Sequence, residues 1–364
     1  MTVFGRSHAI SETAVLPLRV GGALSWRIRL RGVAVSVLGL GLLALLMAMN
    51  MRIGEIEMTL AEVVAGTFDQ ASAAHFVIME LRLPRALTGA LVGAALALSG
   101  AIIQSIARNP LASPEILGVT TGASVTVVAG VVFSGSVYGG TSGLLSTLGI
   151  PALALLGGLV GATVVYGLAW RRGLDGYRLV LVGIGVAAVF TNVKFWLLTV
   201  GDVNDTGRAM VWITGSLNGR GWEHVVPTAL ALAVLVPVTL LGTRSLDALR
   251  FSDDTVVSLG VRTNLARALL ILAAVLLAAV ATASAGPIAF VALASPQIAL
   301  RLVRSGRPPL LCSAIIGAVL TTGADLIART AFSPLELPVG IVTAVLGAPY
   351  LIHLIWRAQK WAQK

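Results

Sequence analysis

Residues 267–303 decide how this chain must fold; they read RALLILAAVLLAAVATASAGPIAFVALASPQIALRLV. A helix crosses a lipid bilayer in about 20 apolar residues, so this run is too long for a single crossing. Gly286 and Pro287 stand near its middle. Proline removes a backbone donor and clashes with the preceding turn, which breaks a helix. The stretch therefore predicts two membrane-crossing helices joined by a tight turn.

The composition of the whole chain extends this prediction. Of its 364 residues, 57% are hydrophobic and 12% are charged, and the mean hydropathy is +0.92. A soluble domain carries about 25% charged residues, because its surface faces water. The chain is therefore expected to be a multi-span membrane protein. Its net charge of +10 is scattered between apolar stretches, which argues against nucleic-acid binding.

Apolar stretches separated by charged or Pro/Gly-rich breaks predict an all-α, polytopic fold with about ten transmembrane helices. They lie near 33–50, 86–106, 115–133, 151–170, 179–200, 224–242, 267–285, 288–303, 310–328 and 338–356. The first is longer than the apolar region of a signal peptide and is expected to be a retained span. The predicted organisation is a cytoplasmic segment at 1–32, one transmembrane domain at 33–357 with a long loop at 244–266, and a cytoplasmic tail at 358–364.

The basic residues predict the orientation. With the N-terminus inside, 19 of the 26 Lys and Arg residues fall in inner segments. The outer segments hold Arg52, Arg82, Arg85, Arg208, Arg220 and Arg329. Such a bias follows the positive-inside rule, so both termini are expected in the cytoplasm of a bacterial inner membrane.

The chain lacks the residues for catalysis or ATP hydrolysis. Its three lysines, Lys194, Lys360 and Lys364, stand in no phosphate-binding G-x-x-x-x-G-K-[ST] motif. The single Cys312 and the four scattered histidines signal no metal or nucleophile. The chain is thus not expected to be an enzyme or to hold a metal or cofactor, and ATP-driven transport would need a separate subunit.

The longest inner loop has the pattern of a short helix that could contact such a subunit. Ser252 can cap a helix whose first turn is acidic, the next residues supply an apolar edge, and a glycine can end it. These residues are Ser252, Asp253, Asp254, Val256, Leu259 and Gly260. An ordinary connecting helix would show the same pattern.

Several motifs resemble the FecCD family, the permeases of type II ABC importers for ferric siderophores, haem and cobalamin. The most specific runs from Arg82-Leu83-Pro84-Arg85 through Asn109-Pro110-Leu111-Ala112 to Gly122-Ala123. The stretch from Gly286 to Leu293 and the segment from Asp325 to Pro349 are also similar to family signatures. Pro296-Gln297 stands where many members have Pro-His, which favours the siderophore branch over cobalamin.

The resemblance implies ten helices, pairing with a second FecCD-type permease, two ATP-binding subunits that bind ATP and Mg, and an extracytoplasmic siderophore-binding protein. Arg82, Arg85 and Arg329 match arginines that dock the binding protein by pairing with its glutamates, a geometry that suits guanidinium groups. Snorkelling is the alternative, or for Arg329 a local pair with Asp325. The loop at 252–261 matches the coupling helix.

Other residues are candidates for the gate and pathway. Asn109, Leu111, Gly176 and Tyr177 match two gate segments, although Asn-Pro is also a plain turn signal. Lys194 is a charge within a span; it could attract an anionic ferric catecholate or snorkel to the interface. The resemblance places Trp212 at the pathway mouth, where an interfacial aromatic is the alternative, and adds Gln297 to the pathway.

Two other classes of function remain as alternatives. An ion-coupled secondary transporter would need an intramembrane carboxylate, for which Asp325 is the one candidate. An intramembrane enzyme would need a nucleophile with a base, or metal ligands such as H-E-x-x-H, at membrane depth. The sequence therefore favours a ferric-siderophore permease, with haem or cobalamin as the alternative cargo.

Overall fold

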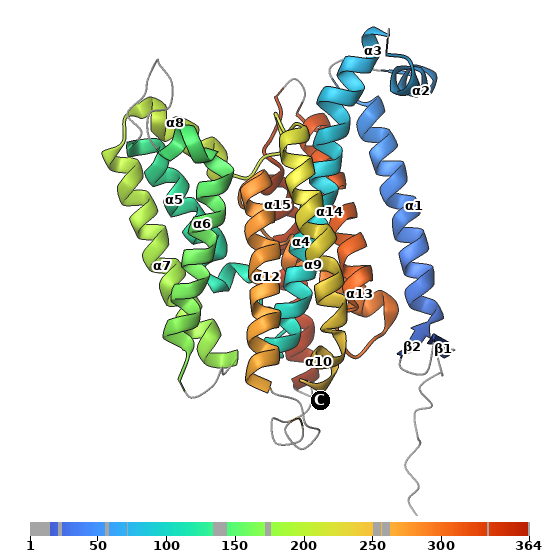
Figure 1. Ribbon diagram of the computed structural model, residues 1–364, viewed down its shortest axis with the longest axis vertical. Coiled ribbons are helices and arrows are strands. Elements are labelled where there is room, and N and C mark those ends of the chain that lie inside the picture. Colours follow the sequence, from blue (N-terminus) through green and yellow to red (C-terminus); the bar gives the residue numbers. More distant parts are fainter. Residues whose placement is uncertain are drawn as a thin grey trace, which may run out of the picture.

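The computed structural model describes residues 15–20, 24–54, 58–70, 72–133, 144–171, 176–249, 256, 263–332 and 335–362. Helices make up nearly all of this part of the chain (Figure 1). They are α1 (Leu30–Arg52), α2 (Leu60–Phe68), α3 (Ala73–Phe76), η1 (Val77–Arg82), α4 (Leu83–Ala107), η2 (Pro114–Leu117), α5 (Val119–Phe133), α6 (Leu144–Ala169), α7 (Gly176–Val200), α8 (Val203–Ile213), α9 (Trp222–Leu241), α10 (Thr243–Ala248), α12 (Thr263–Ala285), α13 (Val291–Val303), α14 (Leu310–Thr330) and α15 (Val339–Ala362).

A β-hairpin, which the sequence analysis did not predict, precedes the first span. Strands β1 (Val15–Val20) and β2 (Leu24–Arg29) pair antiparallel, with Val15 opposite Arg29. At the other terminus, α15 continues to Ala362, so much of the predicted tail at 358–364 extends the last helix. The all-α prediction is therefore confirmed for the transmembrane domain, and the N-terminal segment departs from it.

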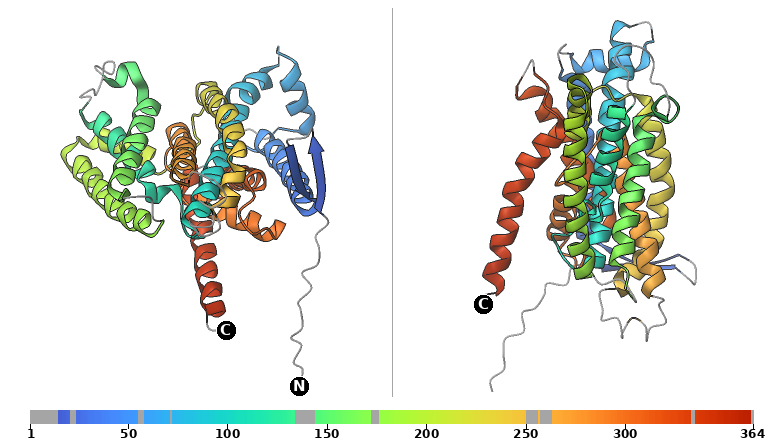
Figure 2. Two further views of the ribbon diagram at one scale, coloured as in Figure 1. Left: turned by 60° about the horizontal axis from the view of Figure 1, so that its bottom comes forward. Right: turned by 90° about the vertical axis from the view of Figure 1, so that its left-hand side faces the viewer.

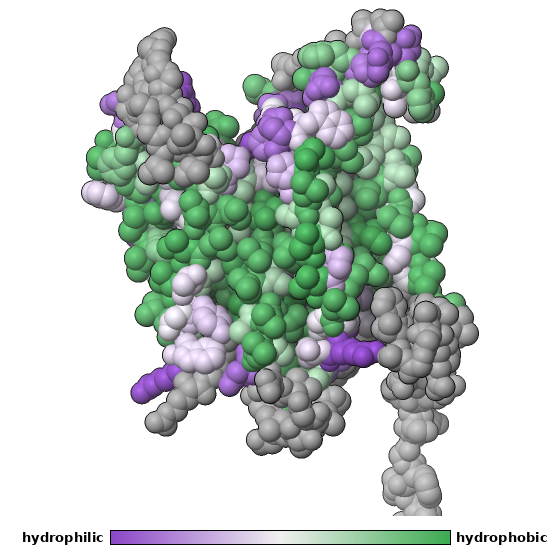
Figure 3. Space-filling view, in the orientation of Figure 1, coloured by the Kyte–Doolittle hydropathy of each residue, from purple (hydrophilic) through white to green (hydrophobic). Residues whose placement is uncertain are grey.

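Ten apolar helices match the ten predicted spans. Among the described residues, seven helices are long and apolar enough to cross a membrane, and three shorter apolar helices lie at Val119–Phe133, Val291–Val303 and Val339–His353. A belt of apolar side chains covers the middle of the face in Figure 3, with hydrophilic residues gathered toward its two ends. The protein is a multi-pass membrane protein.

The predicted break at Gly286-Pro287 is present. Helix α12 ends at Ala285, non-helical residues follow, and α13 begins at Val291. Gly286 (φ +75°) and Phe290 (φ +66°) both have left-handed backbone conformations, which only glycine adopts without steric cost. Helix α5 is also short, and the single turn of η2 precedes it. Interrupted helices of this kind are tolerated in a membrane protein where protein surrounds the free backbone groups.

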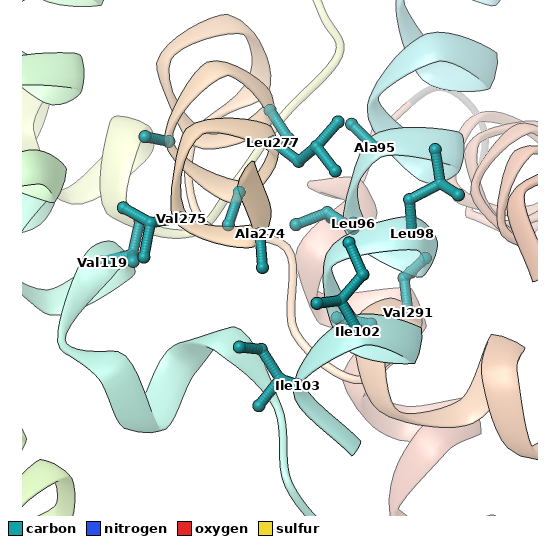
Figure 4. Packing of buried hydrophobic residues seen from close by; sticks show 14 of the residues in the cluster. Ala95, Leu96, Leu98, Ile102, Ile103, Val119, Ala274, Val275, Leu277 and Val291 are labelled. Carbon is teal, nitrogen blue, oxygen red and sulfur yellow. The ribbon is translucent and has the colours of Figure 1, made fainter. Parts of the chain in front are cut away.

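Helix α4 lies at the centre of the bundle. Its side chains Leu96, Leu98 and Ile102 pack with residues of α12 and α13 (Figure 4), and each is at most 2% exposed. Small residues let the backbones approach closely: a Cβ added at Gly93 would collide with the backbone of Gly317 on α14. Such contacts replace the hydrophobic effect as the force that associates helices in lipid.

The elements define two ends of the bundle. The hairpin end carries β1, β2, α10 and the last residues of α15, and the α2 end carries α2, α3 and α8 (Figure 1). Helices α5 to α8 form a group beside the helices around α4, and α1 stands at the opposite edge (Figures 1 and 2). The window of α1 that could span a membrane has no buried residue, so its outward side is open to lipid, while its other side packs against α14, where Ser36 lies 3.3 Å from Cys312.

Candidate functional site

A cavity of about 860 Å³ opens near the α2 end of the bundle. Four arginines and three glutamates line it, and we call it the arginine pocket. The charged lining residues are Arg82, Arg85, Arg220, Arg329, Glu80, Glu223 and Glu336. They come from η1, the start of α4, the start of α9 with the loop before it, the end of α14 and the loop before α15. The three arginines predicted to dock a binding protein thus line one cavity.

Arg82 binds the end of α1. It is the last residue of the π-helical turn η1, a rare geometry that often occurs at functional sites. Its Nη1 donates to the carbonyl oxygens of Met51 (2.5 Å) and Arg52 (3.1 Å). The last carbonyls of a helix lack partners within that helix, and a cation beside them is favourable. Arg82 therefore caps α1, and it is only 7% exposed.

Arg329 caps the same helix end from α14. Its Nη2 donates to the side-chain oxygen of Asn50 (2.5 Å) and to the Asn50 carbonyl (3.3 Å). Its Nε lies 3.8 Å from Oδ2 of Asp325, one turn earlier on α14. The local pair that was the alternative interpretation of Arg329 is therefore present, together with a contact to α1.

Arg85 carries two carboxylates on two different edges. Its Nε and Nη2 donate to Asp325 at 2.9–3.2 Å, and its Nη1 donates to Glu336 at 2.9 Å. Asp325 is only 2% exposed, whereas the Glu336 side chain is 30% exposed and belongs to the loop before α15. Side-on guanidinium–carboxylate pairs with several hydrogen bonds are among the strongest polar contacts in proteins.

Arg220 is a pocket residue to which the sequence analysis assigned no role. Its Nε donates to the carbonyl of Ser216 (3.3 Å), and its Nη1 lies 2.9 Å from Nε2 of His224. Burial lowers the pKa of Arg220, and Glu223 opposes that shift. The guanidinium stays charged in any case, since arginine is not deprotonated in proteins. Glu336 was missed as well, because nothing in the neighbouring residues, such as Leu335 and Leu337, marks its distant partner.

The predicted gate segments meet at the hairpin end. Asn109 Oδ1 accepts from the Leu111 backbone (2.9 Å), which is the turn geometry that Asn-Pro predicts, and Leu111 is 40% exposed. Gly176 begins α7 against the backbone of Ala107, where an added Cβ would lie 3.2 Å away, and Tyr177 is 74% exposed. The two segments are therefore neighbours, and whether they form a gate remains a prediction.

The predicted coupling loop is described only in part. Val256 is helical and fully buried, and Ser252, Asp253, Asp254, Leu259 and Gly260 lie outside the described residues. The neighbouring α10 is linked to the first gate segment, because Arg108 donates to the carbonyl of Leu249 at 2.8 and 3.1 Å. These hydrogen bonds connect the described start of this loop to the residue before Asn109.

The remaining pathway candidates have different surroundings. Lys194 is half-buried on α7, with its ammonium 5.0 Å from the centre of the Phe195 ring. Trp212 is 7% exposed and packs in a cluster with α5 and α7, so its side chain is not at an open mouth. Gln297 is 4% exposed and donates to Gln104 of α4 (2.7 Å), which makes it a contact between helices.

The geometry describes a helical permease with a charged cavity near one end and linked loops at the other. No group of three or more potential metal ligands occurs among the described residues. The FecCD transport family matches residues 42–357, and the chain belongs to this family. It is a permease of the iron-siderophore class of ABC importers.

Individual relatives agree with the family assignment. The chain is 40% identical to the ferric enterobactin transport system permease protein FepG of Escherichia coli (strain K12), over 84% of this chain and 90% of the relative. It is 37% identical to the iron(3+)-hydroxamate import system permease protein FhuG of Bacillus subtilis (strain 168), over 87% and 95%. A solved inward-facing structure assigned to the metal-chelate type of ABC transporter superposes with a TM-score of 0.74 at 26% identity, over 89% of this chain and 99% of that one.

Proposed function

We propose that this chain is the membrane permease subunit of an ABC importer that carries a ferric siderophore of the catecholate type into the bacterial cytoplasm. The 40% identity to a ferric enterobactin permease supports the cargo, while the similarity to a hydroxamate permease keeps the wider siderophore class in view. Lys194 supports an anionic cargo, because a charge within a span is costly and marks a pathway by default.

The partners in this proposal are a second FecCD-type permease, two subunits that bind ATP and Mg, and an extracytoplasmic siderophore-binding protein. The hairpin end lies in the cytoplasm, because most of the basic residues fall in the segments assigned to that side. The coupling loop would contact the ATP-binding subunits there. The chain itself breaks no bond and moves its cargo by alternating between conformations.

The arginine pocket is the observation that carries the proposal. It gathers four arginines near the end of the bundle opposite the coupling loop, where a binding protein would deliver its cargo. Guanidinium groups recognise carboxylates in a defined geometry. Arg85 contributes most to docking in this proposal, because its partner Glu336 is exposed and its guanidinium is therefore reached from the surface. Arg82 and Arg329 bind the end of α1 and support the site from inside the bundle.

The test is uptake of radiolabelled iron bound to catecholate, hydroxamate and citrate carriers. Cells with the intact gene, a deletion and the Arg85→Gln variant are compared, with membrane levels of the chain measured by immunoblot. We expect the deletion to abolish uptake of the catecholate complex and Arg85→Gln to reduce it. Unchanged uptake of every iron carrier in the deletion would refute the siderophore assignment, and loss of haem or cobalamin uptake instead would identify the alternative cargo.

A further inference from the structure

Glu336 stands where the end of α14, the start of α4 and the beginning of α15 meet. Its carboxylate accepts from Nη1 of Arg85 at 2.9 Å, and it is three residues before the start of α15 at Val339. The next residue, Leu337, donates its backbone N–H to the carbonyl of Ala328 (3.0 Å). One side chain therefore connects the lining of the arginine pocket to the segment that leads into α15.

The edges of the Arg85 guanidinium differ in how replaceable their partners are. Asp325 covers the edge formed by Nε and Nη2, and it sits on a helix with 2% of its surface exposed. Glu336 covers Nη1 from a loop, with 30% of its side chain exposed. Because Asp325 occupies the Nε–Nη2 edge from inside the bundle, an incoming carboxylate would approach Arg85 from the side of Nη1, where Glu336 now lies.

The charges around Arg85 favour replacement of Glu336 by an incoming carboxylate over the addition of a third carboxylate. Arg85 already has two carboxylate partners within 3.2 Å, and a third carboxylate would be repelled by both of them. Exchange of one carboxylate for another keeps the local charge constant, and the released Glu336 is already close to solvent, so its hydration costs little.

We propose that Glu336 is an internal substitute for the docking carboxylate of the binding protein, and that docking displaces it from Arg85. This inference rests on the proposed function and adds the regulation of the same site. Displacement frees the segment before α15 from one of its ties, while Gly340 remains bonded to the carbonyl of Gly215 (3.0 Å). The α15 entry segment thereby responds to whether a binding protein is docked.

The test uses the complete transporter in lipid nanodiscs and its own siderophore-binding protein, loaded with the ferric carrier. Affinity is measured by biolayer interferometry for wild type and for Glu336→Gln. We expect the variant to bind about three- to tenfold more tightly, since the internal competitor is lost. Asp202→Asn is the matched control, because Asp202 is exposed at the start of α8, at the same end of the bundle, and does not line the pocket, and it should leave the affinity unchanged.

Salt dependence gives a second readout that a merely structural role would not move. In wild type, docking exchanges one ion pair for another, so the affinity should change little with ionic strength at this site. In Glu336→Gln docking creates an ion pair, and its affinity should fall more steeply with salt. Glu336→Asp retains the charge on a shorter side chain and should give an intermediate affinity, and thermal unfolding of each complex checks that it is folded.

The outcomes separate this inference from the proposed function. One outcome would overturn the exchange and leave the docking site in place. In it, folded Glu336→Gln binds the binding protein as tightly as wild type or less tightly, and Arg85→Gln binds it less tightly than wild type. Unchanged docking in Arg85→Gln would instead overturn the assignment of the arginine pocket as the docking site, and the exchange with it.

Discussion

Asp325→Asn should destabilise the chain strongly, because Asp325 holds the centre of a buried charge network. Its two oxygens accept from Nε and Nη2 of Arg85 at 2.9–3.2 Å and lie near Nε of Arg329. Asparagine has nearly the same size, so the variant removes one charge and leaves the packing unchanged. The Arg85 side chain, only 11% exposed, would keep a single carboxylate partner.

The magnitude follows from the cost of leaving a buried charge without its counter-charge. Removing one partner of a buried pair costs about 3–5 kcal/mol, and we expect the lower part of that range because Glu336 still contacts Arg85. The entropy of unfolding is about 2.1 cal/mol/K per residue, so 1 kcal/mol lowers the midpoint of a chain of this length by about 1.3 °C, and the midpoint should fall by about 4–5 °C.

The assay is thermal unfolding of the purified chain in detergent, followed by intrinsic tryptophan fluorescence. Asp202→Asn is the control, because Asp202 is exposed at the start of α8 with no side-chain capping bond. A double-mutant cycle with Arg85→Gln should show that the double variant loses at least about 1 kcal/mol less than the sum of the singles. If Asp325→Asn behaves like Asp202→Asn, or if the two losses simply add, the account of the network is wrong.

Three further predictions concern packing and capping. Gly93→Leu should abolish accumulation of folded chain in the membrane, because its side chain would collide with α14. Gly41→Leu on α1 is the control, because a side chain there meets nothing within 4 Å, and it should accumulate normally. Equal levels of the two variants on an immunoblot would contradict the close-packing argument. Gln297→Leu should cost about 1 kcal/mol in the same unfolding assay, since one hydrogen bond between helices in a membrane is worth roughly 0.6–1.7 kcal/mol, and a loss above about 3 kcal/mol would show a larger role. Hydrogen bonds from the backbone and side chain of Thr59 lower the pKa of Glu62. The capping box of α2 is therefore intact above the ordinary glutamate pKa and is lost as the pH falls through the lowered value. Amide exchange in α2 should accelerate over that acidic range in wild type and not in Glu62→Gln.

The transmembrane part of the fold was predictable because its signals are local. The length of an apolar run and the breaks within it are set by neighbouring residues, and the division of residues 267–303 at Gly286-Pro287 was found where the sequence placed it. The hairpin before α1 was not predicted. Strands β1 and β2 lie in a short segment whose basic residues were used to predict the orientation, and its strand pattern was not considered.

The site was predictable in its position and less so in its bonding. The resemblance gave Arg82, Arg85 and Arg329 the same role in docking, which remains a prediction, and one cavity contains all three. That two of them cap α1 depends on where that helix ends in space, which the residues around the arginines do not encode. The position of Glu336 likewise follows from a contact across 251 residues of chain. The burial of Trp212 depends on another long-range contact, the packing of α5 and α7 against α8.

The exposed length of α1 has a consequence for how this sequence can drift. A side chain that touches only lipid tails is selected for hydrophobicity and not for shape, so many apolar residues serve equally well there. The family match begins at residue 42, part-way along α1, and runs to residue 357. Natural variants of this protein should therefore accumulate exchanges among Leu, Val, Ile and Ala on the outward side of α1 long before they do so at Gly93 or Gly317, where a single methyl group has no room.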